Sequence, residues 1–234
     1  MARAKEPKKI ALETVMKELK SHANPKNVEG MARFGISPKD TLGISVPILR
    51  KMAKNAGTNH DLALKLWATG VHEARILACL VDDPKAVTER QMENWVNEFD
   101  SWDVCDQCCG SLFDKTEYAH RKAIEWANRK EEFVKRAGFA MMAVLAWHDK
   151  EAKDESFLKF LPIIVKGATD ERNFVKKAVN WALRQIGKRN RALNMKAIET
   201  SKKIQLIDSK SARWIASDAL RELTGAAVQK RLKS

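Results

Sequence analysis

A five-residue segment occurs twice in this sequence of 234 residues, as Phe133-Val134-Lys135-Arg136-Ala137 and as Phe174-Val175-Lys176-Lys177-Ala178. The copies lie 41 residues apart and differ only where Arg136 is replaced by Lys177. Acidic residues precede each copy, at 131–132 and at 170–171, and negative charge stabilises the first turn of a helix. Weaker echoes occur at 72–75 and 210–213. Each copy is therefore expected to begin a helix of a repeated unit, the alternative being a chance similarity of two amphipathic helices.

The spacing of the copies indicates the kind of repeat. A period of about 40 residues is typical of two-helix HEAT and armadillo units. Such units stack into a curved superhelix, whose concave face is lined by the second helix of each pair. The sequence therefore predicts an all-α, HEAT-like helical repeat solenoid. Because no linker rich in Gly, Pro or Ser interrupts it, we expect a flexible basic tail over residues 1–9 and a single domain over 10–234.

Helical signals recur along the whole chain. Four apolar residues near its start follow the spacing i, i+3, i+4 and i+7 of one helix face, namely Leu12, Val15, Met16 and Leu19. Asn24 and Pro25 are suited to the N-cap and the first position of a second helix. Ser45 can cap a third. No long run alternates apolar and polar residues, so we expect about twelve helices and no strand.

Composition excludes several classes of protein. No stretch reaches the roughly 18 apolar residues of a membrane span, and the basic start lacks the apolar segment of a secretory signal. We therefore expect a cytoplasmic protein with reduced thiols. Cys105 and Cys108 have the spacing of half a zinc site, but no second pair follows, so the four cysteines, which include Cys79 and Cys109, are interpreted as structural. No cofactor or metal is expected.

The charge of the chain indicates a polyanionic partner. Lys and Arg number 43 against 30 acidic residues, a net charge of +13. Thirteen cations and four acids lie from Arg184 to Ser234, so nine of the thirteen net charges fall there. Because each phosphate contact releases counterions, such a bias favours nucleic acid. A merely soluble, solvated surface is the alternative.

One segment, residues 100–109, combines a carboxylate and an indole on a helix. Asp100 can cap this helix and Asp103 lies in its first turn, so both have a structural explanation. Asp106 lies among apolar residues, where an ionised carboxylate is costly. Trp102 is four residues earlier and shares its face. This pair suits a cationic substrate. The alternative is structural: Trp102 is buried in the core, and Asp106 forms an ion pair with an Arg of the neighbouring repeat.

A second group of residues follows the repeated segment. Lys177, Trp181 and Arg184 are spaced i, i+4 and i+7, which places them on one helix face. Arg136 occupies the position of Lys177 one repeat earlier, so the two cations are predicted to meet successive phosphates. Trp181 is equally consistent with a place in the core.

These segments together resemble the bacterial DNA alkylation repair family of HEAT-like glycosylases, over residues 10 to 225. The matching segments are Asn24-Pro25 through Met31-Ala32-Arg33, Leu42-Gly43-Ile44, Trp102-Asp103-x-x-Asp106, the two repeated copies, and Trp181-Ala182-Leu183-Arg184. The resemblance implies excision of purines methylated at N3 or N7 from duplex DNA by a monofunctional glycosylase. It implies an open basic groove instead of a deep base pocket.

The resemblance also assigns roles. It implies that Asp106 is the catalytic carboxylate, that Trp102 and Trp181 cradle the damaged nucleotide, and that Arg136, with Lys177 and Arg184, binds phosphate. Phe34 stands where the family has a DNA-contacting Tyr, which removes a hydroxyl, and Ser101 stands where some relatives have a second Trp.

Three functions follow as hypotheses. The first is a glycosylase that acts as a monomer on alkylated double-stranded DNA. The second is a non-catalytic relative that binds damaged, bent or branched DNA, and the third is a HEAT scaffold for other proteins. An Asp106→Asn variant that binds DNA without base excision would support the first.

Overall fold

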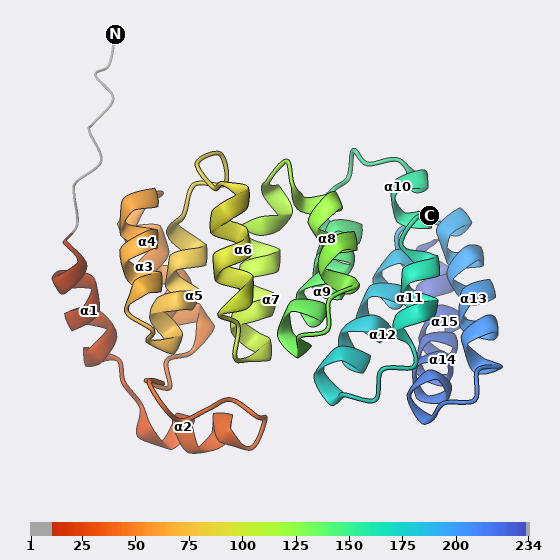
Figure 1. The fold of residues 1–234 in the computed structure, drawn as a ribbon, viewed down its shortest axis with the longest axis horizontal. Coiled ribbons are helices and arrows are strands. Elements are labelled where there is room, and N and C mark those ends of the chain that lie inside the picture. The colour runs from red at the N-terminus through yellow and green to blue at the C-terminus, as the bar shows by residue number, and fades with distance from the viewer. Residues whose placement is uncertain (1–10, 233–234) are drawn as a thin grey trace, which may run out of the picture. The chain divides into compact units, whose positions relative to one another are not determined.

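The computed structural model describes residues 11–232, so the predicted tail over residues 1–9 lies outside the described part. The described chain is helical, with fifteen α-helices, one short 3-10 helix and no strand (Figure 1). The prediction of an all-α protein is confirmed. The helices outnumber the predicted twelve because several are short. Their bounds are α1 Leu12–Ser21, α2 Pro25–Ala32, α3 Val46–Ala56, α4 His60–Ala68, α5 His72–Val81, α6 Glu89–Asn97, α7 Trp102–Ser111, η1 Phe113–Lys115, α8 Ala119–Ala127, α9 Glu132–His148, α10 Asp154–Leu158, α11 Leu161–Gly167, α12 Asn173–Gly187, α13 Arg191–Gln205, α14 Lys210–Leu223 and α15 Ala226–Arg231.

The chain divides into two compact units, one ending at Thr88 and one beginning at Glu89, and each is described by itself. The prediction of a single domain stays a prediction, because a boundary between compact units does not measure independent folding. In the first unit, α5 packs against α3 and α4, and their facing residues, such as Leu49, Leu66 and Leu77, are buried.

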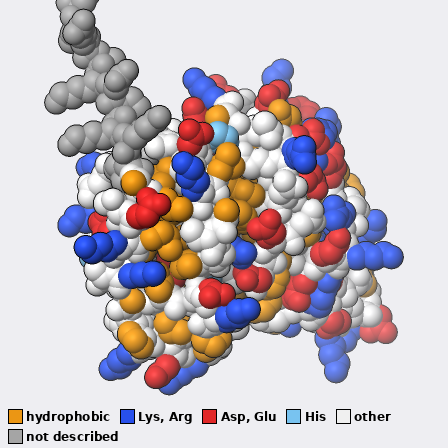
Figure 2. Space-filling model, turned by 60° about the vertical axis from the view of Figure 1, so that its left-hand side comes forward, with side chains coloured by type: hydrophobic (Ala, Val, Ile, Leu, Met, Phe, Trp, Pro, Cys, Tyr) orange, Lys and Arg blue, Asp and Glu red, His pale blue; other side chains and the backbone are white. Residues whose placement is uncertain are grey.

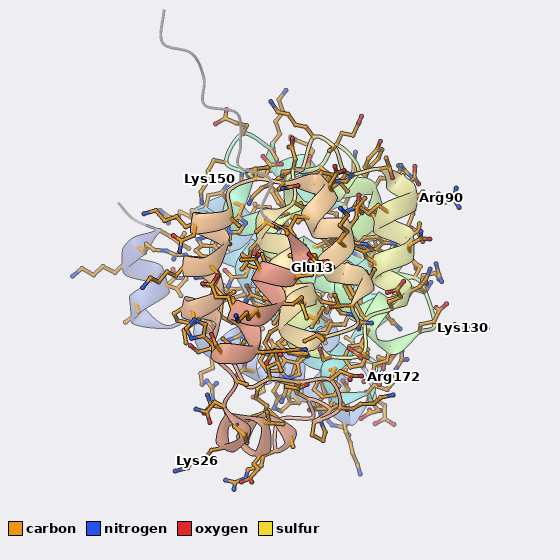
Figure 3. The ribbon with its side chains drawn as sticks, turned by 90° about the vertical axis from the view of Figure 1, so that its left-hand side faces the viewer. Glu13, Lys26, Arg90, Lys130, Lys150 and Arg172 are labelled. Carbon is orange, nitrogen blue, oxygen red and sulfur yellow. The ribbon has the colours of Figure 1, made fainter. Side chains whose placement is uncertain are left out.

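Helix α2 of the first unit buries no residue and runs crosswise to α3, α4 and α5 (Figure 1). Its start follows the prediction, because the Asn24 side chain accepts a hydrogen bond from the Asn27 amide and Pro25 is the first helical residue. Lys26 on this helix points away from the other helices of the first unit (Figure 3). Helix α3 begins at Val46 after Ser45, although the Ser45 side chain makes no capping hydrogen bond.

A buried glutamate fixes the segment that joins α2 to α3. The Glu73 carboxylate, fully buried in α5, accepts hydrogen bonds from the amides of Leu42, Gly43 and Ile44 at 2.8, 2.6 and 3.2 Å. Gly43 has a φ of +78°, which favours glycine. Three amide donors satisfy the buried carboxylate, so Glu73 has a structural role.

The second unit consists of two layers of helices. One layer holds α7, α9, α12 and α14, in which α9 contacts α7 and α12, and α12 contacts α14. The other holds α6, α8, α11 and α13, with α8 packed on α9 and α13 on α14. Helix α9 is the centre of the unit, since every residue from Arg136 to Ala146 is buried. This alternation of layers is the helix-pair repeat that the sequence predicts.

The repeated segment has the structural role predicted for it. Helix α9 begins at Glu132 and α12 at Asn173, again 41 residues apart. The two copies touch, since the rings of Phe133 and Phe174 lie 5.5 Å apart between centroids. Aromatic side chains at equivalent positions of successive repeats therefore stack between neighbouring helices of the same layer.

The cysteines and the surface agree with a packed helical protein. All four cysteines are free and buried, and Cys105 and Cys109 face the backbone carbonyls of α9 residues Phe133 and Ala137. Burial raises the pKa of the Cys109 thiol, which keeps it protonated.

Within residues 11–232 no helix is long and apolar enough to cross a membrane. On the face shown in Figure 2, Lys and Arg side chains are interspersed with acidic ones.

Candidate functional site

The centre of the candidate site is an ion pair between α7 and α9. The Asp106 carboxylate accepts two hydrogen bonds from Arg136, from Nε to Oδ1 at 3.0 Å and from Nη2 to Oδ2 at 2.7 Å. The third nitrogen, Nη1, donates to the backbone carbonyl of Phe174 on α12 at 2.6 Å. One guanidinium thus connects three consecutive helices of the layer. A bidentate pair of this kind fixes both position and orientation of the carboxylate.

The two members of the pair differ in their access to solvent. The Asp106 side chain is 19% exposed and that of Arg136 only 7%. Burial raises the pKa of Asp106 above its ordinary value, while the charge and hydrogen bonds of Arg136 act in the opposite direction. Arg136 therefore favours the ionised carboxylate, and the partly open side of Asp106 is the one that a substrate can approach.

The pairing of Asp106 with an Arg of the next repeat was one of the two interpretations that the sequence left open. The structure places Arg136 against Asp106 and the Phe174 carbonyl instead of against solvent. Its equivalent in the next repeat, Lys177, is exposed. The two positions therefore differ in environment despite their equivalence in sequence.

Helix α7 also carries Trp102, one turn before Asp106. The helix begins at Trp102 with Ser101 as N-cap, so the predicted cap at Asp100 is one residue too early. Asp103 lies in the first turn, as predicted. Trp102 is half-buried. Its indole and the Asp106 carboxylate project from the same side of α7.

On α12, Lys177, Trp181 and Arg184 share a face, as their spacing predicts. Trp181 is half-buried, so it is neither fully in the core nor fully exposed. Arg184 forms ion pairs with Glu222 and, at 3.6 Å, with Asp218 on α14. Its charge is therefore compensated within the second unit, whereas Lys177 is exposed. Phe34 lies in the first unit, where it is 70% exposed.

Sequence reasoning missed a series of contacts between α12 and α14. The residues at 176 and 214, at 180 and 218, and at 184 and 222 face one another, always 38 positions apart. The second and third contacts join Asn180 to Asp218 and Arg184 to Glu222. The sequence did contain a signal for these contacts. The contacting residues are 38 positions apart, and on each helix they follow one another at intervals of four residues.

No metal site accompanies these residues. Among the residues that the structure describes, no group of three or more His, Cys, Asp or Glu side chains is arranged to hold a metal ion. The chemistry available at Asp106 is that of a carboxylate fixed by an arginine, beside an indole. Such a site can stabilise a positive charge.

Comparison with known proteins identifies the family. The model of a family described as "DNA alkylation repair enzyme" matches residues 15–223, which is most of the chain. The chain belongs to this DNA alkylation repair family. The match includes all the candidate site residues, from Phe34 to Arg184. No curated protein sequence matches the chain.

A solved structure supports the fold of this DNA alkylation repair family member. One is described as "a new family of proteins related to the HEAT-like repeat DNA glycosylases with affinity for branched DNA structures". It is 21% identical, with a TM-score of 0.77, and the match covers 95% of this chain and 96% of that one. A designed armadillo repeat protein is 16% identical over 86% of this chain and 99% of its own, but its TM-score is only 0.37. The predicted HEAT-like repeat fold is therefore confirmed.

Proposed function

We propose that this protein is a DNA glycosylase that binds duplex DNA and excises cationic purines alkylated at N3 or N7. The observation that carries the proposal is Asp106, a partly open carboxylate held by Arg136 in a fixed orientation on the same helix face as Trp102. Membership of the DNA alkylation repair family supports it. Phosphate contacts from cations such as Lys177 and an intracellular, DNA-associated location belong to the same proposal.

The proposed reaction is hydrolysis of the N-glycosidic bond. A purine alkylated at N3 or N7 carries a positive charge, so it can leave without being protonated. When the bond between C1′ and the base nitrogen breaks, its electron pair goes to the base and neutralises it, and positive charge develops on the sugar. Asp106 stabilises that charge electrostatically. Water adds to C1′ and loses a proton to the carboxylate or to solvent, leaving an abasic site.

In this proposal Arg136 is a positioning residue and not a phosphate ligand. Each of its three nitrogens donates a hydrogen bond to Asp106 or to the Phe174 carbonyl, and its side chain is only 7% exposed. Its charge and hydrogen bonds favour the ionised carboxylate against the effect of burial, and they fix the orientation of the carboxylate. The half-buried indoles of Trp102 and Trp181 attract the cationic nucleotide.

A second candidate function is binding of branched DNA without catalysis. Both oxygens of Asp106 already accept hydrogen bonds from Arg136, which reduces the charge that the carboxylate can offer to a substrate. The relative with affinity for branched DNA structures is consistent with this alternative. The two candidates differ in one respect, the formation of an abasic site.

The test is an excision assay on a duplex that contains a single 7-methylguanine, in parallel with binding to the same duplex. We expect Asp106→Asn to bind with unchanged affinity and to excise at least about 100-fold more slowly, the usual loss when one electrostatic group of a site is removed. The matched control is Glu131→Gln. Glu131 also accepts two hydrogen bonds from an arginine, Arg129, but is exposed, so excision is expected to stay at the parent rate.

Three outcomes separate the candidates. Excision by the parent protein and by Glu131→Gln, but not by Asp106→Asn, supports the glycosylase. Equal excision by all three proteins excludes Asp106 from the chemistry. Tight binding of branched DNA by a parent protein that excises neither 7-methylguanine nor 3-methyladenine supports the second candidate instead.

A further inference from the structure

An exposed indole lies near the start of α14. Trp214 is 41% exposed in the first turns of this helix. The ammonium group of Lys176, on α12, lies over its ring at 5.5 Å from the centroid. One face of the indole is therefore covered by a cation, and the exposed part of the ring is available to a ligand.

The contacts between α12 and α14 show why this position is unusual. At the second contact Asn180 meets the carboxylate of Asp218, and at the third Arg184 meets that of Glu222. At the first contact the partner on α14 is an aromatic ring instead of an acid. A cation–π contact leaves the full charge of Lys176 in place. Lys176 consequently keeps its charge beside an exposed ring, and the nearby acid that this charge acts on is Glu171.

Two further lysines lie within one turn of this pair on the same two helices. Lys177 follows Lys176 in α12, and Lys210 lies four residues before Trp214 on the same helix face; both are exposed. Of the nearby acids, Asp208 pairs with Arg213 at 2.9 Å. Glu171 accepts hydrogen bonds from the Ser209 hydroxyl and the Ser211 amide and also interacts with the charges of Lys176 and Lys210. Three lysines against this one carboxylate leave a net positive charge beside the ring.

This arrangement points to a particular ligand. An indole among lysines suits a nucleobase whose neighbouring phosphates the lysines can reach. Within a duplex, both faces of every internal base are covered by adjacent base pairs. Away from the ends of a duplex, only an unpaired nucleotide presents a free face to an aromatic ring. Electrostatic attraction to a duplex alone would require the lysines but not the exposed indole.

We propose that Trp214 is a stacking platform for an unpaired nucleotide of DNA, with Lys176, Lys177 and Lys210 binding the phosphates beside it. The inference rests on the proposed binding of DNA and adds a preference for DNA with single-stranded segments. It assigns no role in base excision to Trp214. In this proposal Trp214 and the lysines beside it distinguish DNA with single-stranded segments from a blunt duplex, and Trp214 takes no part in the chemistry at Asp106.

The test compares binding of a blunt duplex with binding of the same duplex carrying a single-stranded thymidine tail. We expect the parent protein to favour the tailed DNA and Trp214→Ala to lose about tenfold in affinity for it, with the affinity for the blunt duplex unchanged. Trp214→Phe keeps a ring and is expected to retain most of the preference. The control is Trp147→Ala, which removes another exposed indole, 61% exposed at the end of α9, and should change neither affinity.

Excision of 7-methylguanine by the same variants distinguishes this inference from the proposed function. Parent-level excision by Trp214→Ala, together with the loss of tail preference, supports both. If Trp214→Ala retains the preference, or weakens binding of both DNA forms equally, the platform is excluded while the glycosylase stands. If the parent protein binds neither DNA, both proposals are overturned.

Discussion

Replacing Arg136 with methionine tests whether the ion pair at the candidate site holds the second unit together. The change removes two hydrogen bonds to Asp106 and one to the Phe174 carbonyl, at 3.0, 2.7 and 2.6 Å. Loss of one partner of a buried pair costs about 3–5 kcal/mol. Because the Asp106 side chain is 19% exposed, water can solvate it in part, and we expect a loss near the lower end, about 3 kcal/mol. In a chain of this size that lowers Tm by roughly 6–12 °C.

A second variant separates structure from chemistry. Asp106→Leu combined with Arg136→Met replaces the pair by apolar side chains, which is often close to neutral for stability. We expect the double variant to recover most of the lost unfolding free energy, so that the coupling energy of the pair exceeds about 2 kcal/mol. It should nevertheless remain inactive in excision, because it lacks the carboxylate.

Urea unfolding followed by far-UV circular dichroism measures the free energies of the parent protein, Arg136→Met, Asp106→Leu and the double variant, which make up this cycle. The 7-methylguanine assay measures activity in parallel. A loss below about 1 kcal/mol for Arg136→Met would show that the pair adds little to stability in solution. Excision by the folded double variant at the parent rate would refute the catalytic role of Asp106.

Three further predictions concern pH, salt and packing. Burial raises the pKa of Asp106, and the proposed reaction needs the ionised carboxylate. The rate of excision should therefore fall as the pH drops through a value above the ordinary carboxyl pKa of about 3.9. Arg136→Gln should move this fall to higher pH, and an unchanged pH–rate profile would contradict the catalytic role of Asp106. Lys177→Gln should reduce the slope of log affinity against log salt by about one, measured on duplexes of different sequence, and an unaltered slope would remove Lys177 from the interface. Gly138→Ala would bring a Cβ atom within 2.6 Å of a Cα atom of α8 and should lower the unfolding free energy by about 1–3 kcal/mol; Gly110→Ala, whose nearest neighbour is a side-chain carbon at 3.2 Å, should cost less.

Local patterns in the sequence predicted the helical class of secondary structure and the repeat, although not the number of helices. The offset of 41 residues between the two copies reappears as the distance between the starts of α9 and α12. The start of α2 at Pro25 also follows from its capping residues. These features depend on neighbours within one or two turns of the chain. Their physical causes, helix capping and the period of the apolar face, are therefore readable without a structure.

Long-range contacts could not be read in this way. The sequence offered Arg136 and Lys177 as equivalent cations, but one is buried against Asp106 and the other is exposed. Arg136 is buried because α7 supplies the Asp106 carboxylate that it pairs with. On α12 the cation that pairs with carboxylates of the neighbouring helix, α14, is Arg184 and not Lys177. Equivalent positions of a repeat acquire different environments because the neighbouring repeat supplies different partners.

The sequence by itself thus determined the class of fold, the repeat, the basic character of the chain and the residues Trp102, Asp106 and Trp181 as a candidate site. Only the tertiary structure decided which charges are compensated, that Arg136 orients Asp106, and that Trp214 lies exposed beneath Lys176. The physical reason is that helix formation is governed by residues close in the chain. The exposure and ionisation of a side chain depend instead on atoms that packing brings together from about 30 to 40 residues away.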